Sequence, residues 1–263
     1  MAFREFANLP KNVQRFRREL YKGCQQAVGV VKQLGEKSTN TQRACTFLAT
    51  ATVINADAAL LLADAELFPP ALSLLRTCLE AQARANYVVS LNPSECEQKA
   101  RDFNDLTDFI QARECEDILA LIAKDGSIPI QCVPPDCAEK CRRIVSKAKL
   151  KLADGETFKS RIRRLEQQWS FSSVTQAMRQ KPKHLLNQPV LEGVEVYWRS
   201  GCLSVHASPA SLLWYSPDLN LIAEIWLRTS LYATISLVLS YGGDPDRELG
   251  TAIQLFRECY QSS

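Results

Sequence analysis

A long apolar stretch of the chain runs from Thr46 to Ala65, with the sequence TFLATATVINADAALLLADA. Small and aliphatic residues occupy almost every position, so a helix here would be apolar on nearly all sides. Such a helix needs other elements around it, because apolar surface is unfavourable in water. Asn40 or Thr41 is placed to cap this helix, which should continue to about Glu66. The sequence therefore predicts a central helix with further helices packed around it.

The segments on either side show helical spacing and end at helix-breaking residues. From Lys11 to Leu34, apolar residues recur three, four and seven positions apart, as on one face of a helix. No stretch alternates apolar and polar residues for more than a few positions, so strands are not expected. One further helix is expected to begin after Pro69-Pro70, and another to run from the capping-box pattern of Ser94 and Glu97 to Lys124. Two short helices are expected around Asp154-Gly155. The remaining expected helices cover residues 169–178, run from Asp218 to Tyr241, and end at Tyr260.

These signals predict an all-α fold, a helical bundle of roughly seven to nine helices. We expect one domain over residues 1–263, with a loop and basic helices at residues 125–190 forming an insertion within it. The apolar helix ending at Tyr241 is interrupted by Glu224 and Arg228. These charges favour a buried core helix over a membrane span, so no membrane association is expected.

Polar residues inside the apolar segments predict an interior network. Asp57 lies within the apolar stretch from Thr46 to Ala65 and needs a partner if it is buried, because an unpaired buried carboxylate is costly. We expect that partner on the following helix, where Arg76 interrupts a leucine stripe with Glu80 four residues later and Arg84 eight residues later. Arg76, Glu80 and Asp57 are therefore predicted to form a supporting polar network. The alternative is that Arg76 extends to solvent while its stem packs against the leucines.

Positive charge is concentrated between Lys140 and Lys183, where the sequence has thirteen Lys and Arg residues but only three Asp and Glu residues. The net charge of the whole chain is only +3. This asymmetry is typical of contact with RNA or another polyanion, and Arg161, Arg163 and Arg164 are the candidate contacts. The alternative is an ordinary solvated face of amphipathic helices.

Ten cysteines are scattered along the helical segments. The first residues lack the basic start and apolar run of a secretory signal, so we expect free thiols and a cytoplasmic protein. Cys132, Cys137 and Cys141 have the spacing C-x4-C-x3-C, which is not a usual zinc-binding spacing and has no histidine nearby. No metal and no cofactor are therefore expected, with these three thiols as the one open alternative for a metal.

The segment EGVEVYWRSGCLSVHASP contains the best candidates for catalysis. Arg199 and His206 are seven residues apart, so on a continuous helix they share one face. Gly201 between them weakens the helix and allows a bend that would bring them closer. Both side chains could then contact one phosphate.

Two short patterns resemble the HEPN-like superfamily, whose members are all-helical. R-SGCLSV-H, from Arg199 to His206, fits the R-x(4–6)-H pattern of that superfamily. The pattern around Arg76, Glu80, Asn86 and Tyr87 is similar to that of uncharacterised bacterial helical families placed near the same group.

Some HEPN-like proteins are metal-independent ribonucleases, including members of defence or toxin systems. The resemblance implies that Arg199 would stabilise the scissile phosphate and that His206 would act as general acid and base. It also implies a homodimer in which two such motifs face one cleft. The alternative, which we favour from the residues themselves, is a scaffold that binds a ligand or partner. His206 would then be a core residue bonded to Glu80 or Asp57, within a buried Arg/His/Glu network.

Overall fold

The computed structural model describes residues 11–34, 37–124, 136–180, 219–250 and 254. Within these ranges every regular element is a helix, and eight of the helices have nine residues or more, beside the short α12 (Pro245–Glu248). The predicted all-α helical bundle is therefore confirmed. The chain divides into two compact units, Met1–Ala100 with Val174–Ser263, and Arg101–Ser173. The second unit overlaps the predicted insertion at residues 125–190, and the single domain stays a prediction.

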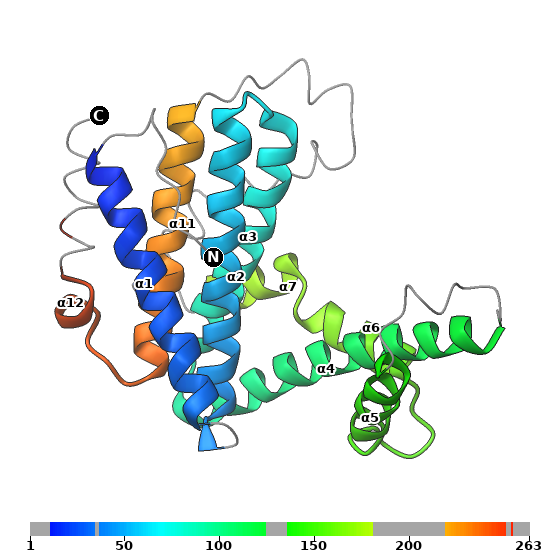
Figure 1. Ribbon diagram of the computed structural model, residues 1–263. Coiled ribbons are helices and arrows are strands. Elements are labelled where there is room, and N and C mark those ends of the chain that lie inside the picture. Colours follow the sequence, from blue (N-terminus) through cyan, green and yellow to red (C-terminus); the bar gives the residue numbers. More distant parts are fainter. Residues whose placement is uncertain (1–10, 35–36, 125–135, 181–218, 251–253, 255–263) are drawn as a thin grey trace. The chain divides into compact units, whose positions relative to one another are not determined.

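Four long helices form the core of the first unit. These are α1 (Lys11–Leu34), α2 (Asn40–Asp64), α3 (Phe68–Val89) and α11 (Leu219–Ser240). The helices α2 and α11 lie in the middle, with α1 packed on one side of them and α3 on the other (Figure 1). The bounds of α1 and α11 agree with the predicted ones because apolar periodicity and flanking glycine and proline residues are local signals.

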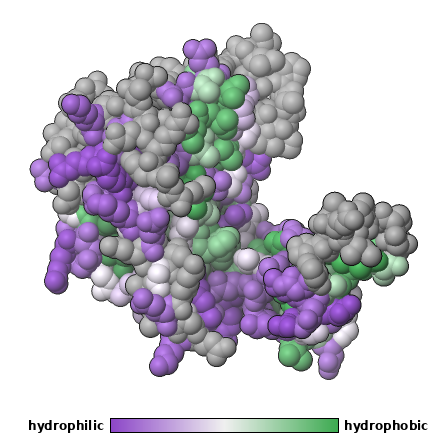
Figure 2. Space-filling model, in the orientation of Figure 1, coloured by the Kyte–Doolittle hydropathy of each residue, from purple (hydrophilic) through white to green (hydrophobic). Residues whose placement is uncertain are grey.

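Alanine and other small residues line the buried side of α2, including Ala44, Ala49, Ala56, Ala59 and Ala63. Small side chains allow the neighbouring helices to approach closely. The opposite side is not covered as predicted, because Phe47, Ile54 and Leu61 are 54%, 41% and 38% exposed. Figure 2 shows hydrophobic surface in the region of α2 and α3. The helix is therefore apolar all round but buried on only part of its circumference.

Two helices are long and apolar enough to cross a membrane by composition, α2 and residues Ile222–Ser240 of α11. In their most apolar windows, 50% and 61% of the residues are buried inside the protein. Trp226 of α11 is fully buried and packs edge-to-face against Phe16 of α1, with ring centroids 5.8 Å apart. The core helices of globular proteins pass the same test of length and hydropathy, so these two helices are weak evidence for membrane spans.

The predicted caps at two helix starts are wrong. The N-cap of α2 is Thr39, which forms a capping box with Gln42, in place of Asn40 or Thr41. In α4 (Pro93–Lys124) the side chain of Asn92 accepts the backbone N–H of Glu95. Glu97 does not complete a capping box with Ser94, because its carboxylate accepts hydrogen bonds from the start of α2.

The second unit contains most of α4, from Arg101 onward, then α5 (Cys137–Lys149) and α6 (Phe158–Gln168). The helix α7 (Phe171–Arg179) begins in this unit and ends in the first. The apolar core of the second unit is aromatic: Phe103 packs edge-to-face on Trp169 at 5.2 Å, and Phe109 lies 5.9 Å from Phe158. The two short basic helices around Asp154-Gly155 are therefore present as predicted.

Acidic residues of α4 neutralise part of the basic segment. Lys151 binds Asp105 at 2.6 Å and Asp108 at 2.7 Å, and Lys149 binds Glu116 at 3.2 Å. The charge asymmetry seen along the sequence is therefore smaller on the folded surface.

Candidate functional site

The predicted catalytic pair, Arg199 and His206, lies outside the described residues, as does Cys132. Their predicted roles therefore stay predictions. Among the described residues, no group of histidine, cysteine, aspartate and glutamate side chains has the arrangement of a metal site.

The predicted arginine–glutamate row along α3 is present. Arg76 Nε donates to Glu80 Oε1 at 3.1 Å, and an Arg84 guanidinium nitrogen lies 3.4 Å from Glu80 Oε2. All three side chains are only partly buried, with 20% to 26% of their surface exposed. Burial lowers the pKa of Arg84, and the Glu80 carboxylate opposes this effect. Glu80 thus holds two guanidinium groups at a partly hydrated surface. This row is therefore neither a fully buried polar network nor a set of fully solvated side chains.

Asp57 has a different partner from the one predicted. Both of its carboxylate oxygens accept hydrogen bonds from Arg17 of α1, which precedes α2 in the chain. Arg17 is 3% exposed and Asp57 is 21% exposed. The expectation of a partner on the following helix is therefore wrong, because α1 supplies a buried arginine on this side of α2. The Arg17–Asp57 pair joins α1 to α2, while Arg76, Glu80 and Arg84 lie along α3.

The three arginines predicted to bind a polyanion differ in their surroundings. Arg164 pairs with Glu156 at 2.9 Å, and Arg161 lies 3.9 Å from the same carboxylate. The Arg161 guanidinium also lies over the ring of Phe109, 5.8 Å from its centroid. Arg163 is exposed and, within the described residues, has no ion pair. It lines a hollow of about 430 Å³ together with Thr157, Lys159, Ser160, Arg164 and Gln167.

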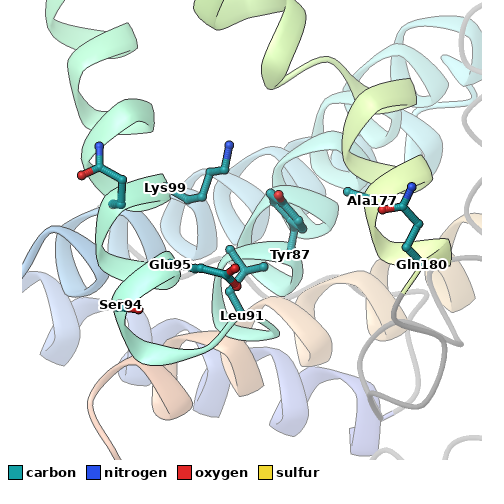
Figure 3. A pocket seen from close by; sticks show the side chains of 8 residues that line it. Tyr87, Leu91, Ser94, Glu95, Lys99, Ala177 and Gln180 are labelled. Atoms are coloured by element: carbon teal, nitrogen blue, oxygen red, sulfur yellow. The ribbon is translucent and has the colours of Figure 1, made fainter.

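A second hollow, of about 450 Å³, lies within the first unit and is lined by three segments (Figure 3). The end of α3 contributes Tyr87, and Leu91 follows it. The first turns of α4 and the end of α7 supply the remaining residues, which are Ser94, Glu95, Gln98, Lys99, Ala177 and Gln180. Its volume is in the range of small-molecule sites.

The polar groups of this hollow differ in charge and hydrogen-bonding capacity. Glu95 and Lys99 lie one turn apart on α4, so an anion and a cation face the same space. Burial and the nearby Glu95 carboxylate both raise the pKa of Tyr87. The phenol therefore stays protonated and can donate a hydrogen bond at neutral pH. Glutamine amides at positions 98 and 180 can donate and accept.

Lys99 is the residue that most suggests a ligand. Its side chain is partly buried and points into the space between α4 and the end of α7 (Figure 3). Among the described residues it has no salt bridge. An acidic group bound in the hollow would pair with the Lys99 ammonium.

The sequence singled out two residues that line this hollow, Tyr87 as part of the pattern on α3 and Ser94 as a helix cap. Lys99 and Gln180 carry no local signal, because charged and amide residues at helix ends are common. They become neighbours only when α4 and α7 pack beside α3. Packing therefore had to be known before the site could be recognised.

No protein-family model, curated protein or solved structure matches this chain. The HEPN-like resemblance is accordingly still a prediction. The described residues define an all-helical protein with a small polar hollow near the junction of α3 and α4.

Proposed function

We propose that this protein is a helical scaffold that binds a small organic molecule in the hollow between Tyr87, Lys99 and Gln180. The ligand carries a carboxylate or phosphate that pairs with Lys99. An apolar or aromatic part of the ligand lies against the Tyr87 ring and Leu91.

One observation carries this proposal: the partly buried side chain of Lys99 lines the hollow and has no salt bridge in the described part of the chain. A lysine in an open hollow attracts anions more strongly than a lysine on a convex surface, because the surrounding protein excludes part of the screening water. Tyr87 and the glutamine amides can then orient the bound acid through hydrogen bonds.

A thermal-shift screen of the purified full chain tests this proposal. The probes are amino acids, their analogues without the amine, and nucleoside monophosphates. A ligand of the native state raises the melting temperature in proportion to its concentration relative to Kd. A hit should lose at least about tenfold in affinity with Lys99→Met, the equivalent of one charge-assisted hydrogen bond. An unchanged affinity in this variant would contradict the proposal.

The matched control is Lys37→Met, which removes an exposed lysine that does not line the hollow. It should leave affinity unchanged. The Glu95→Gln variant distinguishes amino-acid ligands from acids without an amine. It should weaken binding of amino acids, because their ammonium group faces Glu95, and should leave or improve binding of acids without an amine.

A second candidate function is metal-independent endoribonuclease activity, in a homodimer and in a defence or toxin system. The row formed by Arg76, Glu80 and Arg84 favours it, since two guanidinium groups lie at a partly exposed surface of the helix that carries the HEPN-like pattern. In this alternative Arg199 and His206 act on RNA, with the row on α3 as support. A reducing cytoplasm fits both candidates, because the described cysteines are free thiols.

Incubation of single-stranded RNA with the protein in EDTA tests the second candidate. Cleavage should occur and should be abolished by His206→Ala, while circular dichroism and melting temperature stay as in the wild type. Absence of cleavage by the wild type, or a His206→Ala variant that cuts normally, would reject the nuclease function without affecting the ligand proposal. Light scattering on the same sample tests the homodimer.

A further inference from the structure

One side of α2 carries a row of exposed apolar side chains. Phe47, Ile54 and Leu61 follow one another at intervals of seven residues, and they are 54%, 41% and 38% exposed. Ala51 and Ala58 lie between them on the same side of the helix and are partly exposed. The helices α1, α3 and α11 all contact α2, but this side remains open. We call these five residues the α2 stripe, and Figure 2 shows hydrophobic surface in their region.

The spacing of the α2 stripe is that of a seam between two paired helices. Its members follow one another at intervals of four, three, four and three residues, which keeps one face of a helix against a partner helix over several turns. Large and small side chains alternate along the row. Single exposed apolar residues are normal on protein surfaces, whereas a contiguous row is typical of an interaction site.

We propose that the α2 stripe is a dimer interface, at which α2 of a second copy of this chain packs antiparallel. Two-fold symmetry brings the same surface of both copies together, so the surface has to fit itself. In the antiparallel arrangement Phe47 lies opposite Ala58 of the second copy, and Ile54 lies opposite Ala51. Each large side chain then meets a small one, which allows the helices to approach closely. Parallel pairing would set Phe47 against Phe47 and alanine against alanine, which packs poorly.

Charges beside the α2 stripe favour the same arrangement. Arg43 is exposed at the start of α2, and Asp64 is exposed at its end. They are 64 − 43 = 21 residues apart, three times the seven-residue interval of the stripe, so both lie on the same flank of it. When Phe47 lies opposite Ala58, Arg43 of each copy lies beside Asp64 of the other, and two ion pairs form. Parallel pairing would bring like charges together.

The same flank argues against a lipid surface as the occupant of the stripe. Asp57 lies between Arg43 and Asp64 at the same seven-residue interval, and it is 21% exposed. Two of the three charged residues on this flank are therefore acidic, whereas helices that lie on a membrane carry mainly Lys and Arg on their polar side. A protein surface with complementary charge fits better. The inference is drawn from α2 alone, so it rests on neither of the two candidate functions.

Sedimentation velocity of the purified full chain tests the proposal. With rising concentration in the micromolar range, the mass should approach twice the 29.5 kDa of one chain. Ile54→Glu places a carboxylate of each copy near the centre of the interface and should raise the Kd of the dimer by at least about a hundredfold. Leu121→Glu is the matched control, because it changes a 53% exposed leucine of α4, and it should leave the mass unchanged. A wild type that stays monomeric, or an Ile54→Glu variant that dimerises normally, would overturn the proposal.

A second variant keeps the test decisive if Ile54→Glu fails to fold, and it separates dimerisation from lipid binding. Ala58→Phe adds apolar surface but fills the small position that Phe47 of the other copy requires. It should weaken the dimer, whereas a lipid surface should bind this variant more tightly. Flotation with vesicles of phosphatidylcholine and phosphatidylglycerol measures lipid binding. A monomeric wild type that floats with the vesicles would contradict the dimer interface.

Exchange of charges tests the antiparallel direction. Arg43→Glu should raise the Kd of the dimer by about tenfold, because it places two carboxylates side by side. The addition of Asp64→Arg should restore most of the affinity, since the ion pair forms again with the charges exchanged. Arg113→Glu makes the same change of charge at an exposed residue of α4 and should have no effect. Failure of the double variant to recover affinity would reject the antiparallel arrangement.

Discussion

The carboxylate of Glu97 accepts a hydrogen bond of 2.9 Å from the backbone N–H of Asn40. It also accepts the backbone N–H and the hydroxyl of Thr41, at 3.1 and 3.0 Å. Asn40 and Thr41 are the first residues of α2, where backbone N–H groups have no partner within the helix. A side chain of α4 therefore caps α2, 57 residues away in the sequence. This contact holds the first turns of α4 beside the start of α2.

Removal of this cap should destabilise the protein. We expect Glu97→Ala to lower the free energy of unfolding by about 2 kcal/mol, since it leaves helix N–H groups unpaired and removes an anion from a helix N-terminus. Glu97→Gln should cost less, because the amide oxygen can still accept. Urea denaturation measures both. Glu114→Ala, an exposed glutamate of the same helix, should change stability little.

The contribution of Glu97 should depend on pH. Burial acts to raise the pKa of Glu97, but the hydrogen bonds from Asn40 and Thr41 outweigh it and lower the pKa. A carboxyl group whose pKa is lower in the folded state stabilises that state above its unfolded pKa, and the effect is lost as pH falls through the folded pKa. The difference in melting temperature between the wild type and Glu97→Gln should therefore be full at pH 7 and shrink in strongly acidic buffer. A difference that grows with acidity would contradict this.

The pair between Arg17 and Asp57 should be strongly coupled. Arg17 is almost fully buried, so Asp57→Ala leaves a buried guanidinium without this partner and should cost about 3 kcal/mol. A double-mutant cycle with Arg17→Met should show that the two changes together cost less than their sum. Additive losses would show that each residue is stabilised mainly by other contacts.

A buried hydrogen bond between α3 and α11 explains one residue of the HEPN-like pattern. The Ser236 hydroxyl donates to Asn86 Oδ1 at 2.6 Å, and both residues are fully buried. Ser236→Ala should lower the free energy of unfolding by about 1–2 kcal/mol, because it removes a donor from a buried amide oxygen. Thr107→Ala removes a hydroxyl of an exposed residue that bonds to Phe103 of its own helix. This variant is the control and should have a smaller effect by thermal denaturation.

The polyanion prediction can be separated into paired and unpaired arginines. Arg163 and Lys159 line the hollow on α6 and have no ion pair within the described residues, whereas Glu156 pairs with Arg164. If RNA binds here, Arg163→Gln with Lys159→Gln should weaken binding more than Arg161→Gln with Arg164→Gln. Each lost phosphate contact should also reduce the salt dependence of binding. Filter binding at several salt concentrations measures this, and identical losses for the two double variants would argue against this surface.

The presence of most helices could be predicted from the sequence, because the residue patterns that mark a helix are local. Apolar spacing, proline pairs and Gly242-Gly243 mark the ends of α1, α3, α4 and α11, and these boundaries depend on residues within a few positions of each other. The row of Arg76, Glu80 and Arg84 was also predictable, since side chains four residues apart on a helix are neighbours wherever the helix lies.

Contacts between helices could not be predicted in the same way. Asp57 was assigned to the wrong neighbouring helix, and Glu97 was assigned to its own helix start when it caps another. Lys99 was not recognised beside Tyr87. The contact partner of each of these residues depends on which helix faces pack against each other.

The sequence by itself determined that this chain is helical, where most of its helices lie, and which residues interrupt their apolar faces. Only the tertiary structure decided what those interrupting residues bind. The physical reason is the sequence separation over which the interactions act. Helix formation depends on backbone and side-chain interactions within about one or two turns. The partner of a charged or polar side chain depends on the packing of distant segments, which minimises exposed apolar surface over the whole compact unit.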